Sequence, residues 1–472
     1  MILIKYNSKN PISMRYFKEF AVLVLFLGSS GFITNYLDEA LNLIIKSYEL
    51  KSYQRVVTKD TAKVKLGRML FFDKVLSGNR DISCATCHHP GLKSGDNLPL
   101  AIGVGGNGLG ETRTMGEGRD RIPRNSPEIF NRGAREWHTM FWDGRVSKRP
   151  GNGFLTPADE KLPEGLENVL AAQAMFPVTS RDEMRGDIGD LDIFGAKNEL
   201  ALISNAAPQS VWGALMRRIL EFPEYRSLFK EAYPDIPLEK LGFQHAANAI
   251  AAFEIDAFTF TESPWDRYLN GNLTALKDAS KRGALLFYGK ANCAQCHSGN
   301  LFTDQVFHNL GIPQFGPGKD NAAPLDAGRY AETGNPEDKF AFRTPPLRNV
   351  GITGPWMHNG AYVNLEDAIR HHFHPQKSLL EYDLEQLEPS LRASYKNDET
   401  VINKVLYSLD PRLQTPKDFK DDEIKDLVAF MEALTDSRAL NLNSLIPKSV
   451  PSGLPIEEIN KENRSHLKNV GY

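Results

Sequence analysis

The sequence has no basic stripe, no acidic tract and only four cysteines among its 472 residues. Lys and Arg number 56 against 59 Asp and Glu, so the net charge is −3. This balance argues against a nucleic-acid partner and against a disordered acidic tail. The chain is 41% apolar, which is ordinary globular composition, and it is long enough for two or three domains.

The chain also lacks a second long hydrophobic run. The one run near the start, Phe20 to Leu27, follows several basic residues and ends in the small residues 28–31. This pattern predicts an export signal over residues 1–31, and the alternative is an uncleaved N-terminal anchor. No cysteine follows the run, which excludes a lipoprotein. We expect a periplasmic protein, either free or held by that anchor.

The four cysteines form two pairs, each followed by a histidine. The pairs are Cys84-Ala85-Thr86-Cys87-His88 and Cys293-Ala294-Gln295-Cys296-His297. In an exported protein, four cysteines first suggest two disulfides. Zinc is a poorer alternative, because its four ligands belong to one cluster and these pairs lie far apart. C-x-x-C-H is the attachment signature of c-type haem, in which two thiols bond the vinyl groups and the histidine ligates the iron. We therefore expect two covalently bound haems.

Similar segments precede the two motifs. Residues 65–74 and 281–290 both read K-x-G-x-x-L-F-aromatic-x-K, which predicts a short helix packed on each haem. The expected fold is mainly α, with two cytochrome c-like haem domains and long loops. The first domain covers 55–270 with inserted helices over 210–233 and 238–258, the second covers 271–445 with a last helix over 421–435, and 446–472 form a tail.

A haem that reacts with peroxide needs one open axial position, whereas a haem that only carries electrons has both filled. After the first motif, His89 is too close to His88 to reach the opposite face, and we expect it at the surface. No further histidine occurs before His138, which we expect to be a pocket or surface residue. The second motif has more candidates for a sixth ligand, which are Met357, His358, His371, His372 and His374. The sequence thus suggests one open haem and one closed haem.

Several short segments occur in a characteristic order along the chain. They are residues 70–73, 124–127, 141–145, 183–184, 263–268, 343–349 and 353–360. With these landmarks the chain resembles the bacterial diheme cytochrome c peroxidases and their MauG relatives, which oxidise tryptophan side chains of partner proteins. The likeness runs from about Val64 to Thr435.

The resemblance assigns roles by position. It implies that His88 is the proximal ligand of a peroxidatic first haem and that Glu183 is the acid above it, flanked by Gln173 and Pro177. Without the resemblance, Glu183 would pass for a solvated surface residue, because charged residues surround it. The resemblance also implies that Trp142 lies between the haems. A calcium ion between the domains would be bound by Asn125 and, through their carbonyl oxygens, by Thr353 and Pro355.

The resemblance places the sixth ligand of the second haem at His372, where the classical peroxidases have Met and MauG has Tyr. Two histidine ligands favour ferric iron, so we expect a lower potential than in the classical enzymes. Many classical members block the first haem with a histidine that is missing here, so we expect it to be open when oxidised. A long Gly-rich insertion before Arg124 is a further departure and would alter access to the first haem.

Three functions compete. The first is a peroxidase that reduces hydrogen peroxide at the first haem with electrons from a small cytochrome c or cupredoxin, relayed through the second haem. The second is a MauG-like enzyme that uses peroxide to oxidise Trp or Tyr of a partner protein. The third is a non-enzymatic diheme electron carrier, in which a residue such as His138 closes the first iron. The sequence leaves the oligomeric state open.

Overall fold

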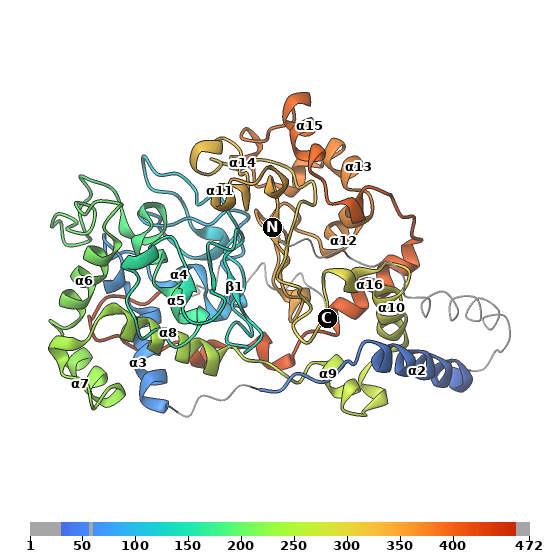
Figure 1. The fold of residues 1–472 in the computed structure, drawn as a ribbon, viewed down its shortest axis with the longest axis horizontal. Helices are drawn as coiled ribbons and strands as arrows, with labels where there is room; N and C mark the ends of the chain where they lie inside the picture. The colour runs from blue at the N-terminus through green and yellow to red at the C-terminus, as the bar shows by residue number, and fades with distance from the viewer. Residues whose placement is uncertain (1–29, 56–59, 459–472) are drawn as a thin grey trace.

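A computed structural model describes residues 30–55 and 60–458, with side chains from residue 36 onward. The expected signal or anchor over residues 1–31 therefore lies almost entirely outside the described residues. Helices dominate the described chain (Figure 1), which confirms the prediction of a mainly α fold. The strands are short and form two antiparallel sheets: β1 (Thr139–Met140), β2 (Val146–Lys148) and β3 (Phe154–Leu155) in one, and β4 (Phe307–His308) and β5 (Phe342–Arg343) in the other.

The first hydrophobic core lies between helices of the N-terminal half. Helix α3 packs against α8, and α5, α6 and α7 surround this pair, on the left of Figure 1. The helices of this half are α3 (Thr61–Phe72), α4 (Cys84–Cys87), α5 (Val169–Ala174), α6 (Pro208–Ile219), α7 (Pro223–Ala232) and α8 (Phe243–Ala257).

A second core lies in the C-terminal half, where α10 packs against α16. The other helices of this half are α9 and α12, which contribute to the same core, and the small helices among the long loops above α10 and α16 in Figure 1. The bounds are α9 (Pro264–Leu269), α10 (Asp278–Tyr288), α11 (Tyr330–Thr333), α12 (Leu365–Phe373), α13 (Pro375–Leu380), α14 (Pro389–Arg392), α15 (Glu399–Tyr407) and α16 (Asp421–Glu432).

The single helix predicted over 210–233 is wrong, because the chain breaks between α6 and α7. Phe222 adopts an extended conformation with φ −83° and ψ 121°, and Pro223 starts the next helix. A proline disfavours helical geometry in the residue before it but fits the first position of a helix. The helix predicted over 238–258 likewise begins later, at Phe243, after a short 3-10 turn.

The repeated segments before the two motifs form equivalent helices, α3 and α10. The shared glycine of each lies where the helix meets its partner. A Cβ at Gly67 would come 1.8 Å from the carbonyl oxygen of Ala249 in α8, and one at Gly283 would come 1.9 Å from that of Asp426 in α16. The repeat therefore encodes the same close helix crossing twice.

Replacing either glycine with alanine is expected to destabilise the protein by about 1–3 kcal/mol or more, because two backbones must separate to admit a methyl group. Chemical denaturation of Gly67→Ala and Gly283→Ala would measure the loss. Gly213→Ala is the matched control, since the nearest atom to a Cβ there is a flexible Arg217 nitrogen at 3.6 Å. That helical substitution should be neutral or stabilise by up to about 1 kcal/mol. Equal effects at all three positions would contradict the crossing argument.

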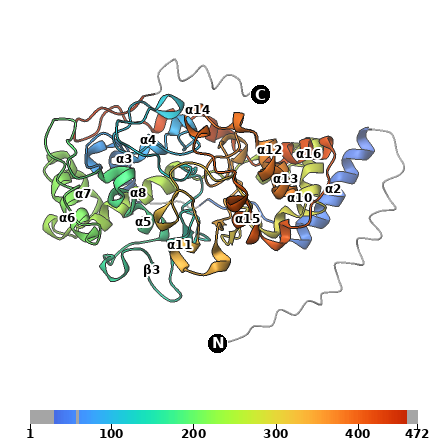
Figure 2. The same ribbon diagram turned by 90° about the horizontal axis from the view of Figure 1, so that it is seen from above.

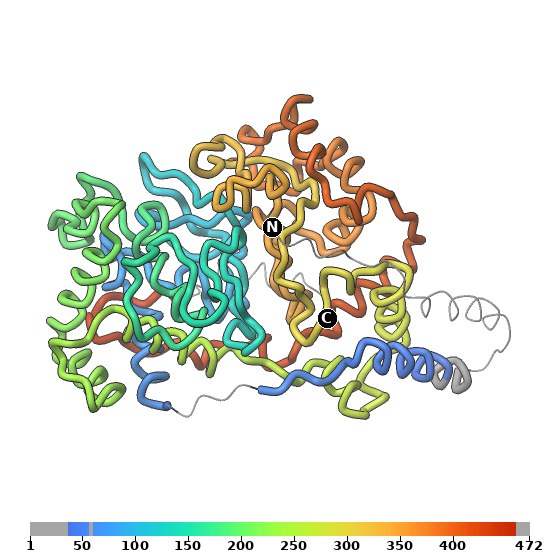
Figure 3. The backbone as a smooth tube through the Cα atoms, viewed as in Figure 1, coloured from blue at the N-terminus to red at the C-terminus, as the bar shows by residue number. Residues whose placement is uncertain are grey.

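The two ends of the described chain cross over. Helix α2 (Ser30–Ser47) lies against α10 of the second half, where Asp38 binds Lys281 Nζ and the Tyr268 hydroxyl, each at 2.7 Å (Figure 2). The C-terminal segment runs back to the first half (Figure 3). There Val450 and Leu454 are buried in the first core. The described part of the predicted tail, up to Glu458, is thus a packed strap.

The strap ends against the first cysteine motif. The Ser452 hydroxyl donates to Asp73 at 2.6 Å, and Glu457 lies 3.3 Å from Lys74 Nζ and accepts a hydrogen bond from the Thr86 hydroxyl. None of the helices in the described residues is both long enough and apolar enough to cross a membrane.

Candidate haem sites

The first cysteine motif opens onto a cavity of about 720 Å³. Cys84 and Cys87 begin and end α4, and both sulfurs are free and line the cavity together with His88. The Nδ1 nitrogen of His88 bonds the Ser94 carbonyl oxygen at 3.3 Å, which leaves Nε2 available. Burial lowers the pKa of His88 to about 4, so the ring is neutral, as an iron ligand requires.

The lining of this cavity also brings together the residues that the family resemblance selected. Gln173 comes from α5, Pro177 from the following 3-10 turn, and Glu183 from a π-helical turn over Arg181–Arg185. Burial raises the pKa of Glu183, and the nearby Arg145 opposes this shift. A carboxyl group held in this way can accept a proton from a bound reactant and return it.

The second motif lines a narrower cavity of about 200 Å³ in the C-terminal half. His297 Nδ1 bonds the Phe302 carbonyl oxygen at 3.0 Å, and His372 Nδ1 bonds the Ala368 carbonyl oxygen at 2.8 Å. The two ring centroids are 6.5 Å apart. When two imidazoles bind one metal ion, two metal–nitrogen bonds of about 2 Å and the radii of the two rings place the ring centroids roughly 6 Å apart. The pair therefore fits one metal ion between the free Nε2 atoms.

Three of the four other candidates for the sixth ligand, His371, His374 and His358, are placed less favourably. Both nitrogens of His371 are bonded, one to the Tyr362 hydroxyl at 2.7 Å and the other to the Leu310 carbonyl oxygen at 2.8 Å. His374 is partly exposed and pairs with Asp418. Met357 and His358 do line the cavity, but the His358 ring stacks on Phe342 at 3.4 Å.

Five residues line both cavities: Asn125, Pro127, Glu128, Trp142 and Arg343. Trp142 donates from Nε1 to the Asn125 carbonyl oxygen at 3.0 Å, which fixes its ring between the two spaces. Thr353 and Pro355 line the second cavity with Asn125, so the three residues expected to bind calcium lie around one space.

Buried arginines line the first cavity and fit an anionic group. Arg132 Nη1 is buried without a hydrogen-bond partner in the described structure. Burial also lowers the pKa of Arg343 to about 9, and Arg132 contributes to that shift. Desolvated guanidinium groups are costly unless paired. The two carboxylates of a haem would supply the missing partners.

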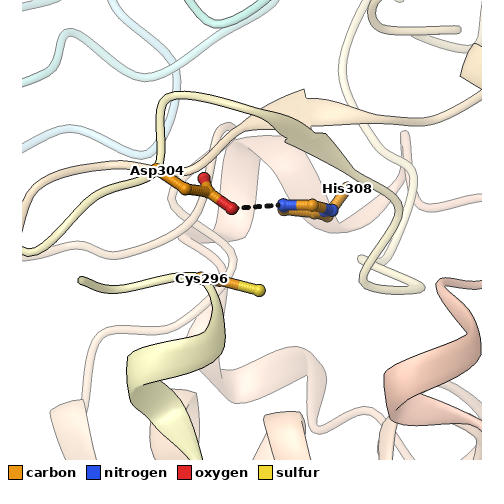
Figure 4. A group of neighbouring side chains, drawn as sticks. All are labelled: Cys296, Asp304 and His308. Atoms are coloured by element: carbon orange, nitrogen blue, oxygen red, sulfur yellow. Dashed lines mark hydrogen bonds and ion pairs between the residues drawn. The ribbon is translucent and has the colours of Figure 1, made fainter. Parts of the chain in front are cut away.

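A third group near the second motif resembles a metal site, but its bonding argues against one. Cys296, Asp304 and His308 each offer one possible ligand atom, and these three atoms lie within 4.8 Å of one another (Figure 4). However, His308 bonds Asp304 at 3.1 Å and Asp410 at 2.9 Å. Burial alone would lower its pKa, but these carboxylates raise it to about 11. Because both ring nitrogens of His308 are already bonded to these carboxylates, neither is free to ligate a metal.

Two expectations for the first site need comment. The surface position expected for His89 is wrong: the side chain is fully buried, with Nδ1 bonded to the Gly91 amide at 3.1 Å and Nε2 3.4 Å from the Glu457 carbonyl oxygen. His138 is exposed and does not line the cavity. His88 is the one histidine among the described residues that line the first cavity.

Comparison with known proteins decides the family. The model of the di-haem cytochrome c peroxidase family matches residues 61–274. The methylamine utilization protein MauG of Methylorubrum extorquens is 31% identical over 373 residues, which are 79% of this chain and 78% of that protein. This chain belongs to the diheme cytochrome c peroxidase and MauG family. Another family member, the cytochrome c551 peroxidase of Pseudomonas aeruginosa, is 31% identical over 65% of this chain and 70% of its own.

Solved structures of the family agree with the fold. A MauG-like protein associated with microbial copper homeostasis is 26% identical, with a TM-score of 0.55 over 85% of this chain and 97% of its own. A diheme peroxidase from Burkholderia thailandensis has a TM-score of 0.52 at 22% identity, over 86% of this chain and 94% of its own, and supports the fold alone. Family membership implies two haem groups, and the two cysteine–histidine cavities are where this chain can hold them.

Proposed function

We propose that this protein is a periplasmic diheme c-type peroxidase that reduces hydrogen peroxide at the first haem with electrons relayed through the second. The first haem would be bound by Cys84, Cys87 and His88, and the second by Cys293, Cys296, His297 and His372. The observation that carries the proposal is the asymmetry of the two cavities. Among the described residues, the first cavity is lined by one histidine together with the Glu183 carboxyl group, whereas the second holds His297 and His372 with ring centroids 6.5 Å apart.

A bound haem supplies the iron at which the O–O bond of peroxide is cleaved. The residues of this chain then handle the proton. Glu183, half-buried and beside Arg145, accepts a proton from one peroxide oxygen and returns it to the other. Gln173 and Pro177 shape the wall next to it. Trp142, which lines both cavities, is the aromatic side chain through which charge passes between the two sites.

Asn125, Thr353 and Pro355 are proposed to bind a calcium ion at the boundary of the two halves. The side-chain nitrogen of Asn125 donates to the Leu98 carbonyl oxygen at 2.8 Å. This bond leaves the side-chain oxygen Oδ1 available as a calcium ligand. Oxygen ligands of this kind suit Ca²⁺.

A second candidate is a MauG-like enzyme whose substrate is a Trp or Tyr of a partner protein. Two features favour it: among the described residues no second histidine lines the first cavity, and the sixth ligand proposed at the second is His372 and not Met. The donor of the first candidate would be a small cytochrome c or a cupredoxin. Steady-state turnover with reduced cytochrome c separates the two enzymes, because only the first candidate sustains it.

Low-temperature EPR of the fully oxidised protein tests the shared part of both. We expect one high-spin ferric signal from the first haem and one low-spin signal from the second, and a reaction with peroxide without prior reduction. Two low-spin signals would mean that a ligand closes the first iron. The protein would then need reductive activation or be an electron carrier.

A further inference from the structure

We propose that Arg145 is the positioning residue that favours the ionised form of Glu183, in which the carboxylate can accept the peroxide proton. This inference rests on the proposed function, in which Glu183 is the proton acceptor. It concerns a residue to which the sequence resemblance gave no role. The argument comes from the hairpin that carries Arg145, from its contacts and from the charges around Glu183.

The hairpin between β1 and β2 aims two side chains at the first cavity. Phe141 has φ 64° and Gly144 has φ 70°, so the turn is tight and left-handed at both ends. A Cβ at Gly144 would come 2.2 Å from the ring of Phe307, which presses on the turn from the C-terminal half. Trp142 and Arg145 both line the cavity as a result. The geometry that places Trp142 between the cavities thus also places a guanidinium group opposite Glu183.

The guanidinium group of Arg145 is held on three sides. It stacks on the Phe141 ring at 3.7 Å from the centroid. Its Nη1 donates to Asp143 Oδ2 at 2.9 Å, and its Nη2 lies 3.8 Å from Glu183 Oε1. Because the first two contacts fix the plane of the group, the approach of Nη2 to Glu183 is determined by the fold.

Asp143 cannot neutralise Arg145 by itself, because it is shared. It is fully buried and also accepts a hydrogen bond from Arg124, whose other nitrogens bind Asp326 of the C-terminal half. The charges therefore alternate from Asp326 through Arg124, Asp143 and Arg145 to Glu183. The group of this series that faces Glu183 is therefore the positive guanidinium group of Arg145.

Four charged groups face Glu183 from the surrounding elements. Asp182 and Asp143 raise its pKa, as burial does, whereas Arg145 and Lys319 lower it. Arg145 is the cation within ion-pair distance of Glu183 in the described structure. Removing its charge must therefore raise the pKa of Glu183, so that the carboxyl group stays protonated to a higher pH and cannot accept a proton there.

The test is an infrared titration of Glu183 in the oxidised holoprotein, with its carboxyl band identified by its loss in Glu183→Gln. In Arg145→Gln we expect the midpoint to rise by about one pH unit, since an opposite charge at this distance shifts a carboxyl pKa by at least that amount. The acidic limb of the peroxide reaction should move by the same amount. Arg145→Lys keeps the charge and should restore most of the midpoint. Arg149→Gln removes an exposed charge just after β2 and should change nothing.

Phe141→Leu supplies a second variant in case Arg145→Gln does not fold. It keeps the charge but removes the surface on which the guanidinium group rests, so the midpoint should rise by less than in Arg145→Gln. An unchanged midpoint in both variants, with haem spectra like those of the wild type, would overturn the inference. If the wild type does not react with peroxide but Arg145→Gln still shifts the midpoint, the proposed function fails while the role of Arg145 in setting the charge of Glu183 stands.

Discussion

Glu183→Gln is expected to slow the reaction of the oxidised protein with hydrogen peroxide by about 10²–10⁴-fold, the usual contribution of one acid–base group. Glutamine has nearly the same shape as glutamate but cannot accept the peroxide proton. The wall formed with Gln173 and Pro177 should therefore persist while the chemistry is lost. Stopped-flow absorbance with excess peroxide measures the rate.

Two controls make this result specific. The haem absorption and EPR spectra of Glu183→Gln should match those of the wild type, which shows that the cavity is intact. Glu160→Gln, which changes an exposed carboxylate, should react at the wild-type rate. A Glu183→Gln protein that still reacts at that rate would mean that another group, or water, accepts the proton.

His372→Met is expected to raise the reduction potential of the second haem by an amount on the order of 0.1 V, within the range of roughly 0.8 V that axial ligands control. A thioether ligand stabilises the ferrous iron relative to a second imidazole. The unbranched side chain of methionine also fits a position that already points into the cavity. Spectroelectrochemical titration of both haems measures the shift, and the first haem should change far less.

The same helix offers a matched control. His374→Gln replaces a partly exposed histidine that pairs with Asp418, and it should leave the potential of the second haem unchanged. If His372→Met changes neither the potential nor the low-spin signal while His374→Gln or Met357→Leu does, then His372 is not the sixth ligand.

The parts of the site that could be predicted from the sequence are those set by local chemistry. Covalent attachment of haem requires two thiols and a histidine at fixed spacing, so the two motifs were visible without a structure. The repeated segments were visible for a similar reason, because Gly67 and Gly283 each permit a helix crossing that a side chain would prevent. The acid Glu183 needed the family resemblance, since its own neighbours in the sequence suggest a solvated surface.

The features that were not predicted depend on contacts between distant parts of the chain. His89 was expected at the surface, yet it is buried and contacts the carbonyl oxygen of Glu457, which lies 368 positions later in the sequence. Arg145 stood inside a recognised landmark, but its role depends on a turn that brings it to Glu183. His308 is bonded to Asp410, which lies 102 positions away, as well as to the nearby Asp304. Only the break at Pro223 carried a local signal that the prediction overlooked.

The crossing of the two chain ends has a consequence for biogenesis. During synthesis and export the first cysteine pair emerges long before Ser452 and Glu457, which close the back of its motif. Helix α2 emerges before both pairs, but its binding surface on α10 follows more than two hundred residues later. Neither half can complete its packing until the whole chain has been delivered. The side of the first cysteine motif that Glu457 contacts therefore stays uncovered until residues 452–457 have been delivered, which is after both motifs have emerged.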